Sequence, residues 1–191
     1  YFKQLSDSTK TVTTSVDVLV SGTQWGGLYG NDIHTGKQLW KLSDNGLGNR
    51  GASPVYKNGK LWIISSKSFF TIEPQTGKVL QQKELSANLD VTSTPLITEQ
   101  EIIFGTADRG VFALDKSTLF NKWKAETSPS LVYTAPYSTT PQAGVETSPF
   151  ASQGIVYIGA SDGYLYAIDQ TTGIIKDKRH IGAPIFSTVA V

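Results

Sequence analysis

A nine-residue pattern that recurs four times is the feature that most constrains the fold of this chain. Each copy begins with an apolar or aromatic pair, continues to an acidic residue and ends in a Thr-Gly turn or a variant of it. The copies cover residues 28–36, 69–77, 111–119 and 165–173. Their acidic residues are separated by 41, 42 and 54 positions. A period near 40 residues with β-rich content is typical of a propeller or a solenoid.

A second marker, a hydroxyl residue followed by proline, keeps the same spacing. It occurs as Ser53-Pro54, Thr94-Pro95 and Ser148-Pro149, and Pro54 is again 41 residues before Pro95. Both intervals lengthen between the third and fourth copies, which indicates an insertion of about a dozen residues. An insertion that leaves the flanking repeats intact belongs in a loop, and we place it over residues 126–144.

The fourth repeat predicts four short antiparallel strands. The first opens at Ser148, the second covers residues 155–159, and Asp162-Gly163 forms a hairpin turn to the third over 164–168. A fourth strand follows over 174–178. The sequence therefore predicts an all-β fold of four four-stranded propeller blades in one domain, 1–191. The predicted blades cover residues 9–44, 51–86, 91–126 and 145–181, and residues 183–191 are expected to be the first strand of a next blade.

Most residues of the repeat signature have a mechanical interpretation. An aspartate before a turn accepts hydrogen bonds from backbone N–H groups two residues on, and glycine closes the turn at a φ angle that other residues resist. The tryptophans that follow the turn are expected to pack one blade on the next. The signature residues are Asp32, Gly36, Trp40, Glu73, Gly77, Asp115, Trp123, Asp169 and Gly173. A catalytic carboxylate would not need repeating in every unit, so we expect a structural role.

Composition excludes several other classes of protein. The chain has 17 basic and 16 acidic residues, a net charge of +1, and no clustered basic face of the kind that binds nucleic acid. It has no cysteine, so disulfides and thiolate metal sites are excluded. No apolar stretch reaches the roughly 18 residues that a membrane helix needs. The absence of methionine, including at position 1, suggests a chain processed or excised from a longer one.

The pattern Ala-x-Asp-x-x-Thr-Gly-x-x-x-Trp resembles the repeat of the pyrroloquinoline quinone (PQQ) type β-propellers, with its inter-blade tryptophan. The resemblance covers nearly the whole chain. Three positions depart from it: Gln81 and Asp177 stand at the tryptophan position, and Leu119 replaces a turn glycine. Such repeats are specific for fold and weak for function, because the family includes quinoprotein dehydrogenases, outer-membrane assembly scaffolds and propellers attached to secreted hydrolases.

The resemblance also implies a setting. Propellers of this family usually have seven or eight blades, so four blades resemble an arc of a larger ring. An open blade face exposes apolar surface, which favours association, and a homodimer through the open faces is one expected form. Family members of this kind imply a periplasmic, extracellular or cell-surface location.

The face that carries the second-to-third strand loops and the inserted segment is the expected partner-binding face, since long loops on one face of a repeat array often bind. Its candidate residues are Trp25, Arg50, Arg109, Tyr133, Tyr137, Asp162 and Arg179. Two of them have a plainer alternative: Trp25 can cover the blade edge, and Arg109 can be a solvated turn residue. No catalytic constellation and no metal-binding spacing stands out, so neither catalytic nor metal-ligating residues are assigned.

These observations favour a non-catalytic binding or scaffolding domain of a larger exported protein, with a protein or a polysaccharide as partner and no cofactor. The alternative is a fragment of a PQQ-dependent dehydrogenase, which would require PQQ and calcium. Enzymes of that kind typically hold the quinone against a vicinal cysteine pair, and this chain has no cysteine. A third interpretation, an accessory domain of a secreted hydrolase, is equally compatible with the sequence.

Overall fold

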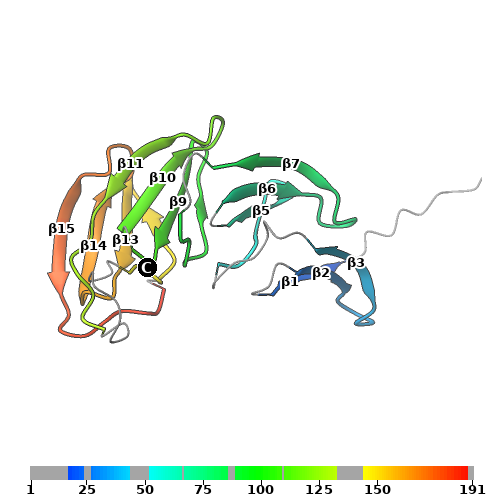
Figure 1. Ribbon diagram of the computed structural model, residues 1–191, viewed down its shortest axis with the longest axis horizontal. Helices are drawn as coiled ribbons and strands as arrows, with labels where there is room; N and C mark the ends of the chain where they lie inside the picture. The colour runs from blue at the N-terminus through cyan, green and yellow to red at the C-terminus, as the bar shows by residue number, and fades with distance from the viewer. Residues whose placement is uncertain are drawn as a thin grey trace, which may run out of the picture.

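The computed structural model describes residues 17–23, 27–43, 52–65, 67–85, 89–108, 110–132 and 144–188. Within them lie four antiparallel sheets that follow one another in chain order along a curved row (Figure 1). In each sheet, strands adjacent in the chain are adjacent in space. The predicted all-β, blade-like architecture is confirmed.

The strands of the first sheet are β1 (Val18–Gly22), β2 (Gly27–Asp32) and β3 (Gln38–Ser43). Those of the second are β4 (Val55–Lys57), β5 (Lys60–Ile64), β6 (Ser68–Ile72) and β7 (Val79–Glu84). Those of the third are β8 (Leu96–Ile97), β9 (Glu101–Thr106), β10 (Gly110–Asp115) and β11 (Asn121–Ala125). Those of the fourth are β12 (Phe150–Ser152), β13 (Ile155–Gly159), β14 (Tyr164–Asp169) and β15 (Ile175–His180). Residues 9–16, predicted to begin the first blade, lie outside the described part.

The inner strands of the second and third sheets are buried on both faces. In β5, Leu61 and Ile63 pack toward the first sheet, whereas Trp62 and Ile64 pack toward the third. The third sheet repeats this division, with Phe104 facing the second sheet and Ile103 the fourth. Because both faces need apolar side chains, these strands are continuous apolar runs without a polar alternation. The core therefore consists of three separate layers, one at each junction between sheets.

The acidic residue of each repeat organises the turn between the last two strands. The Oδ1 atom of Asp32 accepts hydrogen bonds from the backbone N–H groups of His34 and Thr35 at 2.8 and 3.0 Å. These hydrogen bonds hold the pKa of Asp32 below its usual range. Asp115 and Asp169 make the equivalent contacts, and Glu73 instead accepts from the Thr76 hydroxyl at 2.5 Å.

Two tryptophans connect neighbouring sheets. The Trp40 Nε1–H donates to the carbonyl oxygen of Pro74 in the second sheet's turn, and the Trp123 Nε1–H donates to that of Gln170 in the fourth sheet's turn, each at 2.8 Å. Each indole lies on the glycine that closes the same turn: a Cβ at Gly77 would lie 2.6 Å from the Trp40 ring, and one at Gly173 2.7 Å from the Trp123 ring. Both glycines also have positive φ, so no other residue fits without strain.

The segment after the fourth sheet differs from its prediction as a first strand. Residues 183–188 form no strand, and 189–191 lie outside the described part. The Ile185 N–H donates to the Ala160 carbonyl oxygen at 3.1 Å, and its side chain covers Gly159. No helix among the described residues has the length and apolar character to cross a membrane.

Candidate functional site

The expected binding face contains a buried carboxylate that fixes the start of the inserted segment. Asp162 lies in the turn between β13 and β14 and is only 2% exposed. Its Oδ2 atom accepts hydrogen bonds from the Tyr166 hydroxyl at 2.5 Å and from the Ser128 N–H at 2.8 Å. Its Oδ1 atom accepts from the Tyr164 N–H at 3.0 Å. Asp162 therefore joins the insertion to the fourth sheet and is not an exposed ligand contact.

Tyr166 is held as a neutral hydrogen-bond donor. Burial, together with the hydrogen bond that it donates to Asp162, raises the pKa of the phenol to about 12. The Tyr166 ring lies in the core layer between the third and fourth sheets. The phenol thus couples the inserted segment to that core across the physiological pH range.

Backbone hydrogen bonds fix both ends of the insertion. The Leu131 N–H donates to the Ser161 carbonyl oxygen at 2.9 Å, and the Ser161 N–H donates to the Gly144 carbonyl oxygen at 3.0 Å. The Val145 N–H donates to the Thr106 carbonyl oxygen at 2.9 Å, which connects the same region to the third sheet. The described parts of the insertion are consequently held by the sheets on both sides.

A shallow hollow of about 180 Å³ lies where the insertion meets the two sheets. Its lining residues are Ala107, Ser130, Val132, Gly144, Glu146, Ser161 and Phe186. Pockets for small organic ligands usually enclose ~300–1,000 Å³, so the hollow is small for one. Around it, the side chains of Leu131, Val132 and Phe186 are exposed by 55%, 38% and 53%. Exposed apolar groups on a fixed backbone suit contact with a macromolecule.

Of the seven candidate binding residues predicted from the sequence, two fall in the described part. Arg179 lies in β15, exposed, with its Nε atom 3.5 Å from an Asp177 carboxylate oxygen. Arg179 pairs with Leu165, whereas the Asp162 carboxylate contacts Tyr166 on the other face of the sheet, so the structure does not bring the two candidates together. The other five lie outside the described residues: Trp25, Arg50, Arg109, Tyr133 and Tyr137.

Sequence reasoning missed Tyr166, Ser128 and the apolar residues of the insertion. Tyr166 belongs to the repeat signature and therefore looks like an ordinary strand residue. Its signal is the four-residue spacing from Asp162, because Asp162 lies just before β14 and alternate residues of an extended segment share one face. Ser128 has no comparable signal, since the path of an insertion is not repeated elsewhere in the chain.

The described residues offer no metal centre. Within ranges 17–23, 27–43, 52–65, 67–85, 89–108, 110–132 and 144–188, no group of three or more histidine, aspartate or glutamate side chains could hold a metal ion. The acidic turn residues are occupied by their own backbone, as described above. What this face supports chemically is recognition by apolar contact and hydrogen bonding.

Comparison with known proteins finds one matching family. The profile described as "outer membrane protein assembly factor BamB" matches residues 24–136. No curated protein matches the chain in sequence.

Solved structures show the same fold at low identity. BamB from Moraxella catarrhalis superposes with a TM-score of 0.65 at 20% identity, covering 90% of this chain and 51% of that one. A computationally designed protein gives 0.63 at 17%, covering 91% and 50%. The quinohemoprotein alcohol dehydrogenase from Comamonas testosteroni gives 0.61 at 15%, covering 87% and 34%. The chain thus spans about half, or less, of each of these three structures.

Proposed function

Because this chain belongs to the PQQ-repeat β-propeller family of the outer membrane protein assembly factor BamB, we propose that it is a non-catalytic binding module of a larger exported protein. Its partner is a protein, and its location is the periplasm or the cell surface. The family description supports both parts of the proposal. The chain's role is to present the face that carries the inserted segment.

The observation that carries this proposal is the anchored, apolar insertion. The buried Asp162 and Tyr166 hold its first residues. Its exposed Val132 lines the same hollow as Phe186, and Leu131 beside it in the chain is exposed as well. Holding a loop before binding reduces the entropy lost when a partner docks on it. Exposed apolar side chains then supply the contact area.

Site-specific photocrosslinking tests the proposal. A photoreactive phenylalanine analogue at Val132 in the full-length protein, expressed in its native cells, is expected to yield one discrete crosslinked protein. The control position is Leu80 on β7, which is 45% exposed against 38% for Val132 and lies two sheets away. Equal crosslinking from both positions, or none from Val132, would count against a protein partner on this face.

Two further measurements separate the alternatives. Light scattering with and without PQQ and calcium reports both self-association and cofactor uptake. A dimer that ignores PQQ agrees with the binding module and with association through open sheet faces, on one of which Leu19 is 57% exposed. A saturable change in PQQ absorbance in the presence of calcium would favour the dehydrogenase fragment. Binding to a polysaccharide in place of a protein would favour the accessory domain of a hydrolase.

A further inference from the structure

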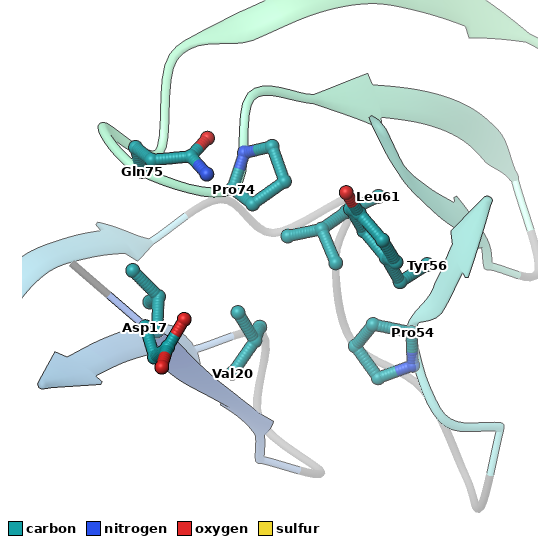
Figure 2. Close-up of a pocket in the computed structure, with 8 residues that line it drawn as sticks. Asp17, Val20, Pro54, Tyr56, Leu61, Pro74 and Gln75 are labelled. Atoms are coloured by element: carbon teal, nitrogen blue, oxygen red, sulfur yellow. The ribbon is translucent and has the colours of Figure 1, made fainter. Parts of the chain in front are cut away.

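A cleft of about 410 Å³ lies between the first and second sheets (Figure 2). Its wall includes the turn between β6 and β7, whereas the inserted segment adjoins the turn between β13 and β14, at the opposite end of the strands. The walls of the cleft are formed by Asp17, Val18, Val20, Pro54, Tyr56, Leu61, Pro74 and Gln75. Asp17 and Gln75 lie on one side of the opening, and Tyr56 and Pro54 on the other (Figure 2). The volume falls in the ~300–1,000 Å³ range typical of ligand sites.

The repeat shows which side chain fills the equivalent of this cleft at the next junction, between the second and third sheets. Val20 in β1 pairs with Gly30, and Trp62 in β5 pairs with Thr71. Gly30 and Thr71 are both the third residue of the recurring pattern, so Val20 and Trp62 are equivalent positions. Val20 is half-buried at the cleft, whereas the Trp62 indole lies inside the core layer between the second and third sheets.

The surroundings of Trp62 define the chemistry of that place. The Trp62 Nε1–H donates to the Lys57 carbonyl oxygen at 3.0 Å, and the Lys116 ammonium lies 5.0 Å from the ring centroid. Lys116 follows the acidic residue of its repeat, as Pro74 does in the second sheet. Pro74, which forms part of the cleft wall, is thus the second-sheet equivalent of Lys116, the third-sheet residue that contacts the Trp62 indole.

Among the described residues, the second sheet leaves the cleft unfilled at Tyr56 as well. Tyr56 pairs with Leu61, and Ile97 in the third sheet pairs with Ile102, so the two are equivalent. Ile97 is 4% exposed in its core layer, whereas Tyr56 is 66% exposed at the edge of the cleft. An exposed tyrosine beside an apolar cleft is a common arrangement at the centre of protein interfaces.

We propose that this cleft binds an aromatic side chain presented by a partner protein, in the position that the Trp62 indole fills one junction away. The walls at Val20, Leu61 and Pro74 contact the ring faces, Tyr56 packs against its edge, and the Asp17 carboxylate accepts a hydrogen bond from an indole N–H. The inference rests on the protein-binding part of the proposed function and adds a second contact on the opposite face.

The test uses the tripeptide Gly-Trp-Gly as probe and Gly-Ala-Gly as control, followed by backbone amide chemical shifts of the full chain. Gly-Trp-Gly is expected to shift the amides of Val18, Val20 and Leu61, and Gly-Ala-Gly is not. Val20→Trp supplies the missing indole, so it is expected to weaken Gly-Trp-Gly binding by about tenfold or more and to raise Tm by a few degrees as a filled cavity does. Leu19→Trp, on the other face of β1, is the matched control and retains binding.

Unaltered binding in a folded Val20→Trp variant, or no shift with the parent chain, would each overturn the proposal. Tyr56→Ala removes an exposed side chain and leaves the core intact, so it serves if Val20→Trp does not fold. It is expected to weaken Gly-Trp-Gly binding about threefold to tenfold, and unchanged affinity would also overturn the proposal. Crosslinking from Val132 tests the other face and does not depend on any of these three variants. An absence of crosslinking from Val132 would therefore contradict the proposed function, whatever the result at the cleft.

Discussion

Two junctions between sheets are built from different residues at equivalent positions: that between the third and fourth sheets, and that between the second and third. At the junction of the third and fourth sheets, the Trp123 indole covers Gly173 and donates to the Gln170 carbonyl oxygen. The junction between the first and second sheets repeats this arrangement with Trp40 and Gly77. Both are tryptophan-glycine junctions.

The junction between the second and third sheets has no tryptophan on its outer strand. Gln81 stands at that position and is exposed, and Leu119 stands at the glycine position with φ 60°. The Leu119 side chain is 3% exposed and fills part of the core layer that contains Trp62 and Phe69. The tethering hydrogen bond comes instead from the Lys83 ammonium, which donates to the Thr118 carbonyl oxygen.

At this junction the two departures from the repeat, Gln81 and Leu119, belong together as one coupled change. A glycine is required only beneath an indole, because a Cβ there would collide with the ring. Where the indole is absent, the turn can carry a side chain, and that side chain then occupies the vacated space. The junction therefore stays filled: its large apolar residue is Leu119 on the third sheet, whereas in the other two junctions it is a tryptophan on the preceding sheet.

The largest effect is expected from Trp123→Ala. Removing a nearly buried indole and its hydrogen bond should lower the free energy of unfolding by about 3–5 kcal/mol. Urea denaturation followed by far-ultraviolet circular dichroism measures the change. Leu80→Ala, at an exposed position, is the control and should change stability by less than about 0.5 kcal/mol. A loss below about 1 kcal/mol for Trp123→Ala would show that the indole is dispensable.

A double-mutant cycle tests the coupling directly. Gly173→Leu should cost about 2–4 kcal/mol in the parent, from the collision with Trp123 and from the positive φ of 74°. In the Trp123→Gln background, which copies the pair at Gln81 and Leu119, the cost of Gly173→Leu should fall by about 0.5–3 kcal/mol.

Gly36→Leu isolates the backbone part of that cost. Gly36 has a φ of 69°, and nothing lies within 4 Å of a Cβ built there. Its substitution should therefore cost only about 1–2 kcal/mol. Additive effects of Gly173→Leu and Trp123→Gln in the cycle would mean that the two positions vary independently.

At the junction with Leu119, glycine and alanine are expected to rank in an unusual order. Leu119→Ala loses the buried side chain and keeps the positive φ, so it should cost about 2–4 kcal/mol. Leu119→Gly loses the same side chain but relieves the backbone, so it should cost roughly 1–2 kcal/mol less than alanine. Thermal unfolding of the two variants compares them, and a more stable alanine variant would contradict the assigned strain.

The repeat made the architecture predictable, because each element of the pattern acts locally. Asp32 and Gly36 determine a turn through contacts within five residues, and the register of β2 with β3 follows from it. Tryptophans at a fixed offset from that turn predicted contacts between neighbouring sheets. Leu119 was recognised as a departure from the pattern, but its link to Gln81 depends on how two neighbouring sheets pack, with the two residues 38 positions apart in the chain, and could not be derived from either position alone.

The site was much less predictable for the same physical reason. Asp162-Gly163 has the sequence of an exposed hairpin turn, and the turn forms, but the inserted segment covers it and buries the carboxylate. The cleft at Val20 arises from the size of one side chain in a repeat whose second strands share no sequence pattern. Only the strand register, which pairs Val20 with Gly30 and Trp62 with Thr71, shows that the two positions are equivalent.

The smallest effect is expected from acidification. It should differ between the turn that carries Leu119 and the turn that carries Gly173. Asp115, in the turn that carries Leu119, accepts hydrogen bonds from the hydroxyls of both Ser117 and Thr118, whereas Asp169 accepts one hydroxyl bond, from Thr172. The Ser117 hydroxyl is the largest cause that holds the pKa of Asp115 far below its usual range, and the pKa of Asp169 is lowered chiefly by Thr172. A carboxylate with a lowered folded pKa stabilises the protein above the unfolded value of about 3.9, and this contribution is lost as the pH falls through the folded pKa.

Carboxylates titrate roughly between pH 6 and pH 2. Carboxyl carbon chemical shifts recorded as the pH is lowered over this range should therefore show Asp169 titrating before Asp115. Ser117→Ala should raise the pKa of Asp115 toward that of Asp169, with Ser130→Ala as a distant hydroxyl control. If Ser117→Ala leaves the Asp115 titration unchanged, the Ser117 hydroxyl is not what lowers the pKa of Asp115. The turn that carries Leu119 would then differ from the glycine turns only in its apolar packing and in the hydrogen bond from Lys83.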